Sequence, residues 1–286
     1  MVIYRAIKYG KLTFDYLQME NSLAPAKLFL TLYMYNQITY KIKIMAEFKF
    51  PTETIDLPSK GLLYPKDNPL SSGKVEIKYM TAKEEDILTN QSYIQKGTVL
   101  NKLLDSVILT EGVNQKDLIL GDKNAVLVAT RILGYGAEYK FTYRGEEKTI
   151  DLSTLENKEF DESLITKGKN EFNFILPNSK TPITYKILTG ADELKIDREL
   201  EGLKKINKNA SPELSTRLKY IITSVNGETG AKEIREFVDT FLLAIDSKAL
   251  RRHLRDTQPD VDLRYIDEDG KEVAIPIGIS FFWPEF

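Results

Sequence analysis

Three acidic residues have the types and spacing that general acid–base chemistry would need. Glu84 and Glu85 follow Thr81 in the run Thr81-Ala-Lys-Glu84, and Asp192 follows Thr189 in Thr189-Gly-Ala-Asp192. The same spacing also marks a helix start, where the acid accepts a hydrogen bond from the cap and complements the helix dipole. On the cap interpretation, Gln at positions 84 and 85 costs about 0.3–1 kcal/mol each. The rival interpretation is a hydrolase, which requires these acids to converge in a pocket with raised pKa values.

The composition narrows the other kinds of chemistry. The 286 residues include no cysteine and a single histidine, His253, which excludes disulfides, thiolate zinc sites and multi-histidine metal sites. The acidic run Asp267-Glu-Asp-Gly270 lacks the D-x-D-x-D-G spacing of a calcium loop and is typical of a hairpin turn. The sequence contains no Walker loop, nucleophile elbow or HExxH. We therefore predict no catalytic residue, no cofactor, no metal and no small-molecule substrate.

Charge gives no indication of nucleic acid or membrane as a partner. The formal net charge is −2, and 29% of the residues are charged, so the chain lacks the basic footprint of a nucleic-acid-binding protein. The densest basic cluster is Arg251-Arg252-His253-Leu-Arg255, just before Pro259. Cations at the end of a helix stabilise its dipole. A partner-binding patch that includes Arg251 and Arg252 is the alternative.

The C-terminal tail holds three large aromatic residues, Phe281, Phe282 and Trp283. Chain ends fray unless they are tied down. These side chains must therefore bury against the chain's own core or against another subunit, where aromatic anchors commonly carry binding energy. Both interpretations stay open.

A proline-rich loop, Leu57–Pro65 (LPSKGLLYP), is the other candidate contact surface. Its apolar residues Leu62, Leu63 and Tyr64 sit among turn-forming residues and follow no helix or strand period. We predict that another subunit binds them.

Hydrophobic periodicity predicts an α+β fold. Residues 74–80 alternate as a strand, and residues 122–133 form a nearly all-apolar helix in which Arg131 should pair with a carboxylate. Other helices are expected over residues 97–109, 192–207, 212–226, 231–244 and 247–255, and hairpins over residues 138–152, 171–188 and 261–277.

An internal echo suggests two related lobes. EIKYMTAKEEDI (76–87) and TYKILTGADELKI (184–196) both read as a strand, a threonine, a small residue and an acidic helix start. Each is followed by helices and closed by a hairpin, although strand-to-helix junctions favour such residues in any protein. We expect a first lobe over residues 45–155, a linker over 156–170 and a second lobe over 171–286.

The first 44 residues differ from the rest. Their most apolar run, residues 23–35, falls short of the ~20 residues that a membrane-spanning helix needs. Met45-Ala-Glu47 has the features of a translation start. Residues 1–44 are therefore predicted to be a non-native or disordered extension. An intact natural peptide spanning residues 41–48, found by mass spectrometry, would contradict a start at Met45.

Four blocks carry a resemblance to a known family. FPTETIDLPSKGLLYP (50–65), YMTAKEEDILTNQSYIQKG (79–97), GDKNAVLVATRILGYG (121–136) and FFWP (281–284) resemble the baseplate hub assembly proteins of T-even-like contractile phages. The resemblance covers residues 50–286, and LPSKGLLYP and TAKEED are its most specific parts.

The resemblance implies a non-enzymatic role in building the central hub of a phage tail baseplate. Its partners would be other hub proteins, in the host cytoplasm during assembly and in the tail baseplate of the virion. A transient assembly chaperone that is absent from the mature virion is the alternative. Many relatives carry paired cysteines in the hairpin after the GYG segment, which suggests a zinc knuckle. This chain has Tyr143-Arg-Gly-Glu146 there, so hairpin and side-chain packing must hold that part.

Overall fold

The computed structural model describes Thr31 and residues 33–37, 51–206 and 212–282. Contacts divide the chain into two units, Met1–Phe50 and Pro51–Phe286. The described residues of the first unit are helical and exposed. The prediction of a non-native or disordered extension over residues 1–44 lies almost wholly outside the described residues. No helix in the described ranges is long and apolar enough to cross a bilayer.

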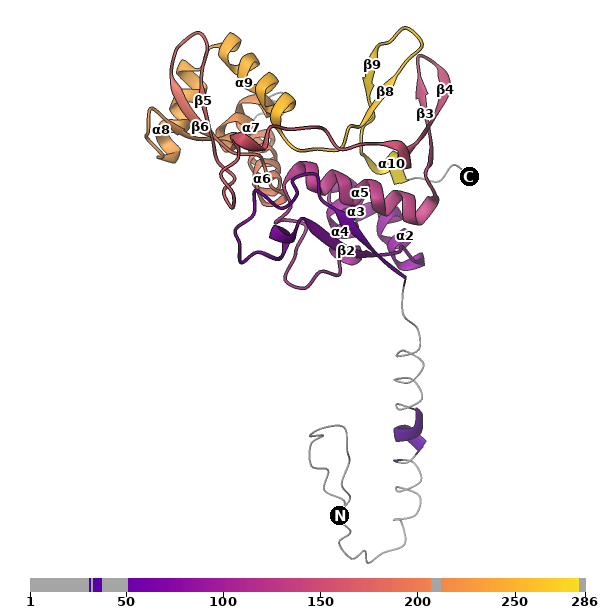
Figure 1. The fold of residues 1–286 in the computed structure, drawn as a ribbon. Coiled ribbons are helices and arrows are strands. Elements are labelled where there is room, and N and C mark those ends of the chain that lie inside the picture. The colour runs from indigo at the N-terminus through magenta and orange to yellow at the C-terminus, as the bar shows by residue number, and fades with distance from the viewer. Residues whose placement is uncertain (1–30, 32, 38–50, 207–211, 283–286) are drawn as a thin grey trace, which may run out of the picture. The chain divides into compact units, whose positions relative to one another are not determined.

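The second unit combines helices with small antiparallel sheets, which confirms the α+β prediction (Figure 1). The sheets are β1 (Thr52–Asp56) with β2 (Lys74–Lys78), β3 (Glu138–Tyr143) with β4 (Glu146–Asp151), β5 (Phe172–Ile175) with β6 (Pro182–Tyr185) and β7 (Ile222–Val225), and β8 (Arg264–Ile266) with β9 (Glu272–Ala274). The main helices are α2 (Ala82–Thr89), α3 (Gln91–Gln95), α4 (Val99–Val107), α5 (Leu120–Tyr135), α6 (Gly190–Ile206), α7 (Glu213–Ile221), α8 (Ala231–Glu236), the π-helical turn η4 (Phe237–Phe241), α9 (Ala244–Thr257) and α10 (Ile279–Phe282).

Two clusters of buried side chains hold this unit. The first core gathers apolar residues of β2, α4 and α5, and the second core lies between the β5–β6–β7 sheet and α9. The predicted lobe boundaries do not match these cores, because Ile275, Phe281 and Phe282 belong to the first core. The predicted linker, residues 156–170, also bonds to the rest of the unit, since the Lys158 N–H donates to the Asp260 carbonyl at 2.8 Å.

The two strand-to-helix junctions in the predicted echo have the same hydrogen bonding. In the first, the carboxylate of Glu84 accepts from the Thr81 N–H at 2.9 Å and from Lys78 Nζ at 2.8 Å. In the second, Asp192 accepts from the Thr189 N–H at 3.1 Å and from Lys186 Nζ at 2.8 Å. The spacing K-x-x-T-x-x-acid is shared, which confirms the helix cap that the sequence predicts at both places.

The loops that precede these junctions also match. Leu57-Pro58-Ser59-Lys60 follows β1, and Leu176-Pro177-Asn-Ser-Lys180 follows β5. Lys60 has φ 52° and Lys180 has φ 59°, the left-handed region that side chains other than glycine and asparagine seldom occupy. Both loops bind a buried aspartate in the first turn of a long helix, Asp122 of α5 and Asp246 of α9. We name residues 52–151 the first half and residues 172–274 the second half.

A third correspondence follows the junctions. The helices α4 and α7 are each nine residues long. The chain then turns back to bridge Ile108 with Ile77 in the first half, and it pairs Ile222 with Tyr185 in the second. The sequence pattern predicted a helix through residue 226, so this last strand was not expected. The run Ile222–Val225 ends α7 because its residues favour a strand that can pair with β6.

Candidate functional site

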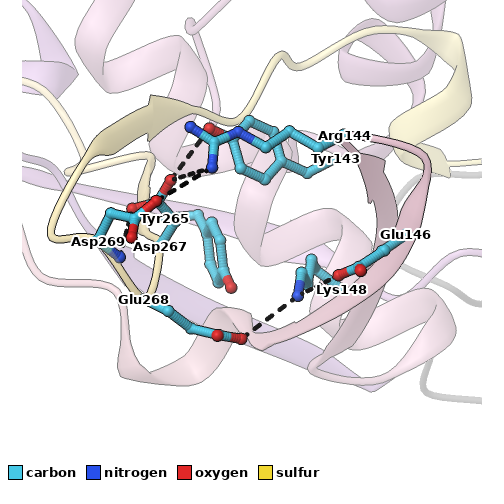
Figure 2. A pocket seen from close by; sticks show the side chains of 8 residues that line it. All are labelled: Tyr143, Arg144, Glu146, Lys148, Tyr265, Asp267, Glu268 and Asp269. Atoms are coloured by element: carbon cyan, nitrogen blue, oxygen red, sulfur yellow. Dashed lines mark hydrogen bonds and ion pairs between the residues drawn. The ribbon is translucent and has the colours of Figure 1, made fainter.

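The tips of two hairpins enclose the cleft drawn in Figure 2. One tip is the turn between β3 and β4, where Arg144 has φ 52° and Gly145 has φ 82°. Two successive residues with positive φ are typical of a tight hairpin turn. The other tip is the turn between β8 and β9. Eight side chains line the cleft: Tyr143, Arg144, Glu146, Lys148, Tyr265, Asp267, Glu268 and Asp269.

Polar contacts join the two tips at one side of the cleft (Figure 2). The Tyr143 hydroxyl donates to Asp267 Oδ2 at 3.1 Å. Arg144 Nη1 lies 3.2 Å from Asp269 Oδ2 and 3.6 Å from Asp267 Oδ2. The arginine therefore bridges two acids of the opposite hairpin.

Lysine and aromatic contacts join the two tips at the other side of the cleft. Lys148 Nζ lies 2.8 Å from Glu146 and 3.6 Å from Glu268 of the opposite tip. The Tyr265 ring makes edge contacts with Phe141 and Tyr143, at centroid distances of 5.3 Å and 6.2 Å. Ion pairs and aromatic packing thus hold the hairpin that follows the GYG segment.

The charges that line the cleft are satisfied within it. The Lys271 N–H, assisted by the Tyr143 hydroxyl and the Asp269 N–H, lowers the pKa of Asp267, so this acid is ionised at neutral pH. The cleft has a volume of about 180 Å³, below the roughly 300–1,000 Å³ of pockets that enclose a small molecule. This arrangement locks two hairpins together and leaves little room for a ligand.

The candidate catalytic acid Glu84 is fully engaged in its helix cap. It is buried, and it accepts from Lys78, from the N–H and hydroxyl of Thr81 and from Ser106 Oγ at 2.5 Å. Burial by itself would raise the pKa of Glu84, but these hydrogen bonds together lower it to about 2. A general acid at neutral pH requires the opposite shift.

The other two candidate acids do not join Glu84. Asp192 is buried, and burial raises its pKa less than the bonds from Lys186 and Thr189 lower it. Its partners in the described part of the chain are Lys186, Thr189 and Lys195. Glu85 is exposed on α2. Glu84 and Asp192 therefore lie in separate helix caps and have lowered pKa values, the opposite of the raised values that the hydrolase interpretation requires.

The LPSKGLLYP loop is an internal support, which corrects its prediction as a contact surface. Asp122 accepts from the Ser59 N–H at 2.9 Å and from the Tyr64 hydroxyl at 2.6 Å. Tyr64 and Leu63 are 5% and 2% exposed. Side chains buried in the chain's own core cannot contact another subunit, so of the predicted residues only half-buried Leu62 remains accessible.

The aromatic tail is tied to the first core. Phe281 and Phe282 are buried, and the Phe281 ring packs 4.9 Å from the ring of Tyr139. Arg131 Nε donates to the Phe281 carbonyl at 2.9 Å, and the same guanidinium bonds two further carbonyls after α5. The expected carboxylate partner of Arg131 is therefore wrong, and so is subunit contact through these two phenylalanines. Trp283 lies outside the described residues.

The basic cluster lies on α9. Arg251 and Arg252 are exposed, and their role as a partner-binding patch stays a prediction. His253 turns inward, where its Nε2 lies 2.9 Å from the Tyr185 hydroxyl and its ring stacks on Phe174 at 4.6 Å. Burial lowers the pKa of His253, so its ring is neutral near pH 7 and belongs to the second core.

One exposed apolar segment was not expected from the sequence. Phe241, Leu243 and Ile245 are 60%, 49% and 58% exposed between η4 and α9. The sequence FLLAI (241–245) did not indicate this exposure, because a helix was expected through residue 244 and would have buried part of the run.

No group of three or more His, Cys, Asp or Glu residues in the described ranges could hold a metal ion. Comparisons of the chain with protein-family models, with curated proteins and with solved structures found no match.

Proposed function

We propose that this chain is a non-enzymatic protein that helps to build the central hub of a phage tail baseplate through protein–protein contacts. The naming of the baseplate rests on the resemblance of four blocks between Phe50 and Pro284 to hub assembly proteins. The partners would be other hub proteins, first in the host cytoplasm and then in the tail.

One observation favours a contact role over the hydrolase. The acids that would serve catalysis, Glu84 and Asp192, are each closed inside a helix cap with a lysine partner and a lowered pKa. Their chemistry stabilises the fold. The exposed Arg251, Arg252 and half-buried Leu62 are the predicted contact residues that remain accessible.

Loss of the gene tests the proposal. In phage particles made without this chain, we expect tails that lack a complete baseplate, seen by electron microscopy, and a loss of infectivity. Supplying the chain in trans should restore both. Normal tails and infectivity without the chain would overturn the proposal.

Quantitative mass spectrometry of purified particles separates the two forms of the proposed function. Copies in a fixed ratio to other tail proteins would identify a hub component. Assembly that depends on the chain, with no copies in the particle, would identify a transient chaperone.

A further inference from the structure

Four cations lie in a row on the exposed side of α9. Lys248, Arg251, Arg252 and Arg255 are all exposed, and helical residues three or four apart lie on the same side of a helix. Because a helix rises about 1.5 Å per residue, the row extends over about 10 Å. We name these four residues the cationic stripe.

Acids and the helix dipole account for only one end of the stripe. Arg255 Nε lies 3.3 Å from Asp256, and of the stripe only Arg255 belongs to the last turn, where a cation complements the dipole. Lys248, Arg251 and Arg252 have no acid as an ion-pair partner within the described ranges. By contrast, an arginine of α7 and an arginine of α8 each bond both oxygens of a glutamate of α6.

The corresponding side of the first half is covered. The helix α5 corresponds to α9, since each has a buried aspartate as its third residue. The counterparts of Arg251 and Arg252 are then Leu127 and Val128, which are 3% and 6% exposed. The side that is apolar and buried on α5 is therefore charged and open on α9.

The segment that covers α5 offers hydrogen-bond acceptors to it. Asn124, at the position of Lys248, donates to the carboxylate of Asp260 at 3.0 Å. Arg131, at the position of Arg255, donates to a carbonyl of α10 at 2.9 Å. Oxygen acceptors thus satisfy the positions of α5 that carry exposed cations on α9.

We propose that the cationic stripe binds an acidic segment of a partner protein, with carboxylates spaced about one helical turn apart. Three residues of the stripe are arginines, and a planar guanidinium group can bond both oxygens of a carboxylate. The inference rests on the proposed contact function and adds the chemical class of the partner.

Neither nucleic acid nor a membrane fits the stripe as well. The chain has a net charge of −2 and lacks the wide basic footprint that binds phosphate backbones. The one ring within the stripe, His253, stacks inward on Phe174, so it is not free to stack on a base. A membrane-surface helix needs a free apolar face, whereas Leu250 and Leu254 of α9 are buried in the second core.

Fluorescence anisotropy with a labelled peptide tests this chemistry on the full chain. The probe is a helical peptide with glutamates three and four residues apart on one face, and its control has the same residues in scrambled order. We expect a dissociation constant between about 1 μM and about 1 mM for the probe. Because exposed ion pairs are screened, the affinity should fall at least about tenfold between about 0.05 M and about 0.5 M salt.

Charge reversal identifies the residues that bind the probe. R251E/R252E should weaken binding at least about tenfold, because attraction becomes repulsion. The matched pair is R252E, which should weaken binding, and R198E, which should not. Arg198 is likewise exposed on a helix and has no ion-pair partner in the part of the chain that the structure describes.

Four results would overturn the proposal. They are wild-type affinity of R251E/R252E for the probe, equal binding of the scrambled peptide, and tighter binding of a single-stranded oligonucleotide or of anionic lipid vesicles at the same salt. The fourth is self-association in sedimentation that R251E/R252E abolishes, which would assign the stripe to a second copy of the chain.

Complementation separates this inference from the proposed function. In particles made without the chain, R198E supplied in trans should restore complete baseplates, and R251E/R252E should not. Revertants of R251E/R252E should exchange an acid of another tail protein for a lysine or a neutral residue. Full restoration by R251E/R252E would overturn the role of the stripe and leave the baseplate role intact. Complete baseplates without any chain would overturn the baseplate role, and the peptide measurements would then decide the chemistry of the stripe.

Discussion

At the scale of single residues, Glu84 shows how burial changes the meaning of a motif. A helix-start acid on the surface contributes about 0.3–1 kcal/mol, the value expected from sequence for both Glu84 and Glu85. The structure buries Glu84 with Lys78 and leaves Glu85 exposed. The earlier expectation is therefore too small for Glu84, because a buried hydrogen-bonded charge is costly to leave without its partner.

E84Q should lower the free energy of unfolding by about 2–3 kcal/mol near pH 7. The pKa of Glu84 falls from 4.5 in the unfolded chain to about 2 in the fold. The stabilisation is therefore complete above about pH 5 and is lost as the pH falls toward 2. Urea unfolding of wild type and E84Q should give curves that converge in acid. E85Q, the control, should stay within about 0.5 kcal/mol of wild type. A constant gap from pH 7 to pH 3 would contradict this account.

Tyr64 provides a second residue-scale test, since its hydroxyl donates to Asp122 and accepts from the Ile119 N–H. Y64F leaves both buried groups one hydrogen bond short, and it should destabilise the chain by about 1–3 kcal/mol. Y93F is the matched control, because no residue in the described ranges bonds the Tyr93 hydroxyl. Equal unfolding midpoints for Y64F and Y93F would contradict a stabilising role for the Tyr64 hydroxyl.

At the scale of elements, the sequence predicted what local chemistry decides. The cap at Thr81, the hairpin around Gly145 and the long apolar helix all depend on residues close in the chain. Features that depend on distant partners were missed. The strand at Ile222 needs β6 beside it, and Arg131 donates to the Phe281 carbonyl, 150 residues away. Burial of the LPSKGLLYP loop likewise depends on Asp122.

Mutations can separate the two kinds of contact, ion pairs and aromatic packing, that join the β3–β4 hairpin to the β8–β9 hairpin. Arg144 is half exposed and its ion pairs meet water, so R144A should leave the stability of the chain nearly unchanged. Y265A removes a ring that packs on Phe141 and Tyr143 and should cost about 3 kcal/mol. Hydrogen exchange of the β3–β4 amides should accelerate in Y265A and change little in R144A. The reverse order would mean that ion pairs, and not aromatic packing, hold the two hairpins together.

At the scale of the whole unit Pro51–Phe286, the two halves are more alike than their letters indicate. The K-x-x-T-x-x-acid junction and the left-handed lysine loop recur with the same partners. These matches go beyond the general preference for threonine and acids at helix starts. That preference does not produce two left-handed lysines in matching loops. The halves differ at the contact between them, where Leu118 and Leu120 of the first half bond Gly190 and Leu188 of the second.

The backbone contact between the two halves requires a glycine at position 190. A Cβ there would collide with the backbone of Gln115 and Lys116, so G190A should force residues 116–120 away from the second half. We expect a loss of about 1–3 kcal/mol and faster exchange of the Leu120 and Gly190 amides, which form the bridge. Gly202 lies in the same helix with open space around it, so G202A should instead stabilise the chain by about 0.5–1 kcal/mol. If G190A were as stable as G202A, with both bridge amides protected, the close backbone contact could not be what joins the halves.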